Sequence, residues 1–336
     1  LAGLLEDSLD AGCAGFSTGL MYAPGSSAGR EELERLCRIV AAQGKLYTTH
    51  MRSYAEGLVE AVREQIALAR AAGCRLQISH LQAAGRANWH RLDRALDEIE
   101  AARQAGIDVE FDIYPYQCGS TVLTQWLPHW ALEGGAAALL GRLHDAAERA
   151  RIREATERGL AQEWSDITIS GLASPKNAPL IGRTIAAAAA QRGTSGVDTA
   201  LDLLAEENAA VNVISFNQSE DNLRRLLTHP LCSVISDGFY VNGKPHPRLH
   251  GTFPELLGAV VREWRWMTLE EAIHKVTGQP AARLRLADRG LLREGFAADV
   301  TVFDPARIRS RATYETPDLP PEGIRLVIRE GQISVG

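Results

Sequence analysis

The chain has 336 residues, of which 45% are hydrophobic and 23% charged, and this is the composition of a globular protein rather than a disordered one. It carries 36 basic and 42 acidic residues, so its net charge is −6 and no basic cluster favours nucleic acid or an anionic membrane as a partner. No apolar run reaches the ~20 residues of a membrane span, and we expect no signal peptide.

Cysteine usage indicates the redox compartment. The five cysteines are odd in number, widely spaced and free of any CxxC pair: Cys13, Cys37, Cys74, Cys118 and Cys232. This usage is typical of a reducing compartment, so we expect a cytoplasmic protein whose cysteines are small hydrophobic residues.

The first third of the chain alternates short apolar strands with amphipathic helices. Strands are expected at 14–20, 45–50, 75–80 and 109–114. Helices are expected at 31–43, 55–72 and 88–104, the second of them ending at Gly73. The repeat of about 30 residues is the length of a βα unit, and the alternation predicts an α/β fold with parallel strands.

The regular pattern stops at Pro115. Residues 117–196 hold a charged helical stretch, one short strand and several turns, so we expect an irregular insertion there. The alternation is expected to resume with a strand at 212–216, a helix at 220–227 and a strand at 232–237. Short strands with glycine turns follow, and we therefore divide the chain into a catalytic barrel domain over 1–285 and a small β module over 286–336.

Two histidines end consecutive predicted strands, KLYTTH and RLQISH. His50 and His80 lie 30 residues apart, which is one repeat of the pattern, and Asp237 ends a third strand, VISD. In a (β/α) barrel the C-terminal ends of the strands surround the active-site mouth, so these side chains should converge. Two imidazoles with a carboxylate nearby favour a metal site over two separate core histidines.

Several segments together resemble the N-acyl-D-amino-acid deacylases of the amidohydrolase superfamily. The resemblance runs in order from about residue 12 to the end of the chain and is weakest over 126–196. It is carried by GFSTGLMYAPG, YTTHMRSY, QISHLQAAG, DIYPYQCGST, VISDG, HPRLHGTFPELLG and DRGLLREGFAADVTVFDP.

The resemblance implies a TIM-like (β/α) barrel with a small β module and zinc-dependent hydrolysis of N-acyl-D-amino acids. His50 and His80 match the family's metal ligands, and Asp237 matches its catalytic aspartate. Tyr114 and Arg248 match the residues that bind the substrate carboxylate. The implied partner is thus a small molecule, with no nucleic acid or membrane involved.

Two departures from the family pattern affect the expected activity. The family's HxH pair and its cysteine ligand have no counterpart in this sequence, so we expect a barrel incomplete at its N-terminus, inactive and weak in zinc binding on its own. Gln82 stands where many relatives carry lysine. Because glutamine is neutral, we expect a preference for substrates with uncharged side chains, unless Arg52 supplies a cation.

Two other functions stay open at this point. A cyclic-amide hydrolase of the same superfamily is the first, although such enzymes commonly carry a carboxylated lysine on a strand that here reads GFSTG. A non-catalytic binding protein built on a degenerate barrel is the second. Stoichiometric zinc that depends on His50 would favour the enzyme.

Overall fold

Five parallel strands form the central sheet, in the order β1-β2-β3-β4-β8. The structure is a computed structural model that describes residues 1–335. The strands are β1 (Gly15–Gly19), β2 (Leu46–His50), β3 (Arg75–Ile78), β4 (Val109–Ile113) and β8 (Cys232–Val234). The α/β class and the TIM-like arrangement are thereby confirmed. Within the described residues the sheet stays open, with Phe16 on its edge strand β1, as expected for an incomplete barrel.

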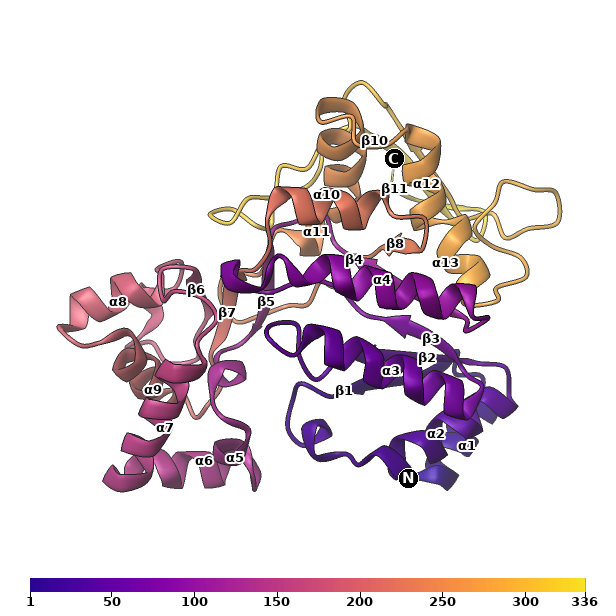
Figure 1. The fold of residues 1–336 in the computed structure, drawn as a ribbon. Helices are drawn as coiled ribbons and strands as arrows, with labels where there is room; N and C mark the ends of the chain where they lie inside the picture. The colour runs from indigo at the N-terminus through magenta and orange to yellow at the C-terminus, as the bar shows by residue number, and fades with distance from the viewer. Residues whose placement is uncertain (336) are drawn as a thin grey trace.

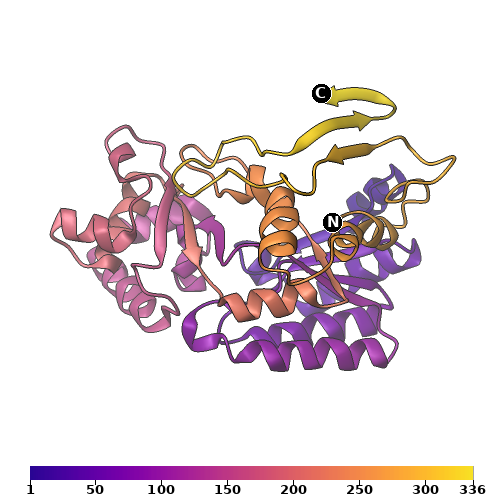
Figure 2. The same ribbon diagram turned by 90° about the horizontal axis from the view of Figure 1, so that it is seen from above.

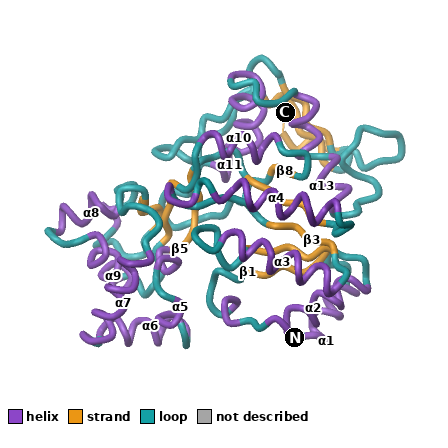
Figure 3. Tube along the Cα trace, viewed as in Figure 1, coloured by secondary structure: helices purple, strands orange, loops and turns teal. Residues whose placement is uncertain are grey.

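Helices next to the strands in the chain cover the sheet. They are α1 (Ala2–Asp10), α2 (Arg30–Ala42), α3 (Leu58–Ala72), α4 (Arg91–Gln104) and α10 (Glu220–Thr228). Figure 3 shows α3 and α4 lying side by side along the strands. In α2 the buried residues Leu33, Leu36 and Val40 recur at helical spacing, and burying this apolar stripe attaches the helix to the sheet. Gly73 ends α3 in the left-handed conformation, where a side chain would be strained.

A separate lobe interrupts the barrel between β4 and α10 (Figure 1). Its strands β5 (Cys118–Val122), β7 (Asn212–Phe216) and β6 (Ile167–Gly171) form an antiparallel sheet in that order. Five helices pack with this sheet: α5 (His129–Leu132), α6 (Gly135–His144), α7 (Ala146–Gly159), α8 (Ile185–Arg192) and α9 (Gly196–Glu206). We call residues 118–216 the inserted subdomain.

The strand at 212–216 corrects one prediction. It was expected to resume the parallel pattern, but β7 pairs with both other strands of the inserted subdomain. Its apolar residues are buried against that subdomain's own core, where Val213 and Ile169 lie together. An apolar run of this length does not reveal which of two sheets it joins, so the insertion extends past residue 196.

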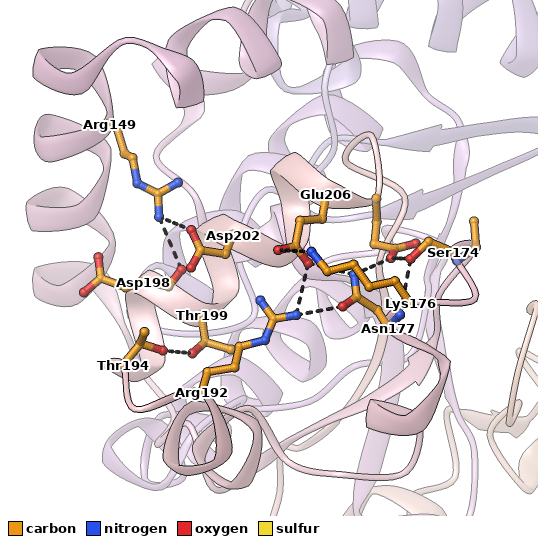
Figure 4. Close-up of polar contacts among 12 residues, drawn as sticks. Arg149, Ser174, Lys176, Asn177, Arg192, Thr194, Asp198, Thr199, Asp202 and Glu206 are labelled. Carbon is orange, nitrogen blue, oxygen red and sulfur yellow. Dashed lines mark hydrogen bonds and ion pairs between the residues drawn. The ribbon is translucent and has the colours of Figure 1, made fainter.

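Hydrogen bonds and ion pairs of polar and charged side chains connect helices and loops of the inserted subdomain (Figure 4). The Asn177 amide nitrogen donates to Glu206 at 2.8 Å, and Arg192 donates to both Asn177 and Glu206. On the other side of α9, Arg149 pairs with Asp202 at 2.6 Å. These ion pairs are partly exposed, so each adds little by itself, but as a network they fix α8 against α9.

The remaining elements follow β8. They are α11 (Arg248–Glu255), a π-helix (Leu256–Glu263), α12 (Leu269–Val276) and α13 (Gly278–Arg283), and then an antiparallel sheet of β9 (Val300–Phe303), β10 (Ile324–Arg329) and β11 (Gln332–Val335). Figure 2 shows these three strands as a layer on the side of the molecule away from α3 and α4. Among residues 1–335, no helix has the length and apolar character needed to cross a membrane.

Candidate active site

A cavity of about 170 Å³ opens at the C-terminal ends of the parallel strands. The six residues singled out in the sequence all line it: His50, His80, Gln82, Tyr114, Asp237 and Arg248. They follow or end β2, β3, β4 and β8, which is where barrel proteins place their functional side chains. The structure therefore brings the whole predicted set together.

The two histidines meet at the floor of the cavity. His80 Nε2 lies 2.5 Å from His50 Nδ1, and the ring centroids are 4.5 Å apart. Burial lowers the pKa of His50 and brings that of His80 well below its ordinary value, His80 being further disfavoured as a cation by His50 and Arg248. Both rings are thus neutral near pH 7, which is the form that binds metals.

Two site residues adopt unusual backbone conformations. His80 has φ 34° and Asp237 has φ 45°, in the left-handed region that non-glycine residues rarely occupy. The His80 conformation is held by Asp112, whose carboxylate accepts the His80 backbone N–H at 2.7 Å and the Gln77 amide at 2.8 Å. Burial raises the pKa of Asp112 to about 7. Such strain at a mouth formed by strand ends is typical of functional sites.

Asp237 and Arg248 form an ion pair inside the cavity. The Arg248 Nη2 atom lies 2.8 Å from Asp237 Oδ2. Burial raises the pKa of Asp237, although Arg248 and then His50 oppose the shift. The strand expected to end at Asp237 stops earlier, at Val234, so Asp237 reaches the cavity from the loop that follows β8. This loop conformation could not be predicted from the period of the strand.

The Arg248 guanidinium is held rigidly with one nitrogen free. Its carbon lies 4.3 Å from the centre of the Tyr114 ring, and the residue is only 1% exposed. His246 uses Nδ1 to accept the Arg248 backbone N–H and Nε2 to donate to the Cys118 backbone carbonyl. Arg248 Nη1 is buried without a hydrogen-bond partner among the described residues, so it can still donate to a ligand.

Sequence reasoning missed the wall of the cavity that the inserted subdomain and its flanks supply. The additional residues are polar and uncharged: Ser120, Thr121, Gln125, Gln162, Ser215 and Asn217. Asn217 directly follows a strand, a signal that the strand-end rule could have used. Gln162 lies in a loop with no such signal. Tyr22, also on the wall, packs edge-on against His50 and hydrogen-bonds Thr121 across the cleft.

The side chains at the cavity include donors that suit a metal ion. The two imidazoles are neutral and face each other, and His80 Nδ1 is buried without a partner within residues 1–335. They supply two of the four ligands that zinc takes in proteins. In the part of the chain that the structure describes, no group of three or more His, Cys, Asp and Glu side chains could hold a metal. The residues present thus fit part of a zinc site.

This fold and this mouth place the chain in the class of (β/α)-barrel proteins whose functional site lies at the strand ends. More narrowly, the chain belongs to the amidohydrolase family, whose model matches residues 3–335. It is 38% identical over 98% of its length to the N-acyl-D-glutamate deacylase of Alcaligenes xylosoxydans xylosoxydans, and 35% identical to the D-aminoacylase of the same organism. The chain spans 59% of each of these relatives.

Solved structures give the same relationship. The N-acyl-D-glutamate deacylase of Bordetella bronchiseptica, complexed with zinc and a phosphonate mimic of the tetrahedral intermediate, aligns with a TM-score of 0.84 at 36% identity. This alignment covers 99% of the present chain and 62% of that protein. The L-hydantoinase of Arthrobacter aurescens aligns at 0.51 with 16% identity, a likeness of fold alone.

Proposed function

We propose that this protein catalyses zinc-dependent hydrolysis of the amide bond of N-acyl-D-amino acids, releasing a D-amino acid and a carboxylate. The observation that carries the proposal is the gathering of His50, His80, Asp237, Arg248 and Tyr114 around one cavity at the strand ends. The deacylase relatives support it, since they are similar over nearly the whole of this chain. The cyclic-amide alternative has only a likeness of fold in its favour.

His50 and His80 would hold the zinc ion. When bound, such an ion polarises an amide carbonyl and lowers the pKa of a coordinated water. The protein contributes two neutral imidazoles, and Asp112 holds the backbone of one of them, His80, in place before any ligand arrives. This preorganisation lowers the cost of assembling the site.

Asp237 would act as the general base and then as the general acid. Its carboxylate takes a proton from the attacking water and returns that proton to the leaving amine nitrogen, so the C–N bond breaks without expelling an amide anion. Burial supports this role because it raises the pKa of Asp237 towards the working pH, where a group can both accept and donate.

Arg248 and Tyr114 would bind the α-carboxylate of the substrate. The unpartnered Nη1 of Arg248 supplies one charge-assisted donor. Its Nη2 is engaged by Asp237, so the fully bidentate contact is open to substrate only when that pair separates. Fixing the carboxylate while the amide carbonyl is held near the histidines distinguishes a D-amino acid from its enantiomer.

The substrate side chain would meet neutral groups. Gln82 lies on the cavity wall, and Arg52, the other candidate cation, pairs with Glu64 at 2.8 Å and donates to two backbone carbonyls. An acidic side chain would therefore lose its hydration without a countercharge. This favours N-acyl-D-amino acids with uncharged side chains.

We extend the proposal to the organisation of the chain. Residues 1–285 form the catalytic unit, and 286–336 form a β module. A cytoplasmic location is supported by five cysteines that all remain free thiols. The mildly acidic net charge is consistent with a protein that does not bind nucleic acid.

The test is a chiral substrate panel. The full-length protein is loaded with zinc and offered N-acetyl-D-amino acids, their L-enantiomers, hydantoins and dihydropyrimidines, and release of free amine or ring opening is measured. We expect release from the D-series only, abolished in His50→Ala. Faster opening of a cyclic amide, or equal rates on both enantiomers, would contradict the proposal.

A further inference from the structure

A second cavity, of about 390 Å³, lies outside the candidate active site. Its wall combines the segment that follows β4, the first turns of α10, the residues after the π-helix and the loop between β9 and β10. Among the described residues the two cavities share no lining side chain, so the second one is a separate space. Its volume is within the roughly 300–1,000 Å³ typical of small-molecule sites, and the proposed hydrolysis gives it no role.

Aromatic side chains make up much of the wall, and we call this space the aromatic cavity. They are Tyr116, Phe216, Trp264, Trp266 and Tyr314. The centroids of the two indole rings are 4.6 Å apart with their planes inclined by 39°, and Trp264 is 43% exposed. The buried ring of His246, which does not line the cavity, meets the rings of Tyr116 and Tyr314 edge-on and so braces them. The negative faces of such rings, indoles above all, attract cations.

The charged groups of the aromatic cavity are all acidic. Glu255 and Glu220 line it, and within residues 1–335 no lysine, arginine or histidine does. Glu255 is half-buried, and burial together with nearby Glu263 raises its pKa to about 7. Arg86 lies 4.8 Å from the centre of the Phe216 ring but is not part of the wall. The Glu255 carboxylate therefore has no countercharge inside the cavity.

We propose that the aromatic cavity binds a small organic cation of the ammonium or quaternary ammonium class. A neutral apolar ligand would leave Glu255 buried without a countercharge, and an anion would be repelled by both carboxylates. Hydrated metal cations take six or more oxygen ligands, which a wall of aromatic rings does not supply. A free amino acid is also a poor fit, because its own carboxylate would meet no positive group. Only an organic cation matches both the rings and the carboxylates.

The test is calorimetric titration of the zinc-loaded full-length protein with choline, at constant ionic strength and at pH 8, where Glu255 is ionised. The neutral comparison is 3,3-dimethylbutan-1-ol, which has the shape of choline with carbon in place of the charged nitrogen. We expect choline to bind with a Kd of about 1 mM or tighter and the alcohol to bind at least about tenfold more weakly. Equal affinities, or no binding of choline at about 10 mM, would overturn the inference.

Variants then locate the bound cation. Trp264→Ala and Glu255→Gln should each weaken choline binding about three- to tenfold, through loss of a ring face and of a carboxylate. Their matched controls are Tyr240→Ala, an aromatic residue that is 81% exposed and outside the cavity, and Glu294→Gln in an exposed loop. Asp237→Asn alters the candidate active site and should bind choline as the wild type does. Wild-type affinity in both cavity variants, in folded proteins by circular dichroism, or lost affinity in Asp237→Asn would overturn the assignment to this cavity.

Discussion

Arg248 is paired with Asp237 at 2.8 Å at the cavity, where Arg248 is buried and Asp237 is half-buried, and within residues 1–335 the second terminal nitrogen of the guanidinium has no hydrogen-bond partner. The pair has two consequences. Burial raises the pKa of Asp237, and the positive charge of Arg248 opposes that rise, which favours the carboxylate form that can act as a base. Arg248 and Tyr114 both line the cavity, and the proposed binding of a substrate carboxylate uses this second nitrogen. This one ion pair thus bears on both the proposed role of Asp237 as a base and the proposed binding of the substrate carboxylate by Arg248.

The first prediction concerns Asp237. Asp237→Asn should lower kcat by about 10²- to 10⁴-fold, because the amide cannot take a proton from water. Zinc content should remain unchanged, since the histidines are untouched. In the wild type, kcat/KM should fall as the pH drops through the raised pKa of Asp237, and this acid limb should disappear in the variant. Wild-type turnover by Asp237→Asn would exclude the assigned role.

The second prediction concerns the metal. His50→Ala and His80→Ala in the full-length protein should each lose bound zinc on dialysis. Substituting a residue that only supports a ligand typically lowers metal affinity about 10- to 100-fold, and removing a ligand itself should lower it further. His90→Ala, an exposed histidine before α4, is the matched control and should retain zinc. Elemental analysis of the dialysed proteins measures this. Retention of zinc by His50→Ala would show that the ion binds elsewhere.

The third prediction concerns substrate choice. The wild type should prefer uncharged N-acetyl-D-amino acids to N-acetyl-D-aspartate and N-acetyl-D-glutamate, because among the described residues the paired Arg248 is the one lysine or arginine that lines the cavity. Gln82→Lys should shift the ratio of kcat/KM values towards the acidic substrates by about tenfold or more, the worth of a charge-assisted hydrogen bond. A wild-type protein that favours acidic substrates would contradict this reasoning.

The fourth prediction concerns stability and pH. Glu255 lies in a pocket with Tyr116 and Trp266, where burial and nearby Glu263 raise its pKa from 4.5 to about 7. The folded chain therefore binds this proton more tightly than the unfolded chain, so stability is lost as pH rises from about 4.5 to about 7. Glu255→Gln should stabilise the protein by about 1–2 kcal/mol at pH 8 and by little at pH 5.

Urea denaturation at the two pH values measures that difference. Glu294→Gln, a substitution in an exposed loop, is the control and should leave the pH dependence unchanged. A Glu255→Gln protein with the same dependence as the wild type would mean that the carboxylate stays ionised in the pocket.

The parallel part of the fold could be predicted because its information is local. Each βα unit repeats within about 30 residues, and the helical spacing of Leu33, Leu36 and Val40 shows which face of α2 is buried. The strand β7 could not be assigned, because its apolar residues suit either sheet equally well. Its pairing with β5 and β6, whose residues lie far away in the chain, decides which sheet β7 joins.

The candidate site likewise has a part that the sequence predicts and a part that it does not. His50 and His80 were found because strand ends of a barrel share one mouth. The left-handed backbone at His80 depends on a carboxylate from the neighbouring strand, Asp112, and no local pattern records that contact. Asn217 and Gln162 reach the cavity only because the inserted subdomain packs over it, so their part in the site follows from tertiary structure.

The insertion also affects how the chain can fold during synthesis. Phe111 of β4 pairs with Cys232 of β8, so the entire inserted subdomain emerges from the ribosome between two neighbouring strands. At ~5–20 residues per second, the edge of β4 waits on the order of 10 s for its partner. During that interval its backbone donors and acceptors are open to other chains. The inserted subdomain, with a core of its own, can fold in this time, and a destabilised version of it would be expected to aggregate through β4.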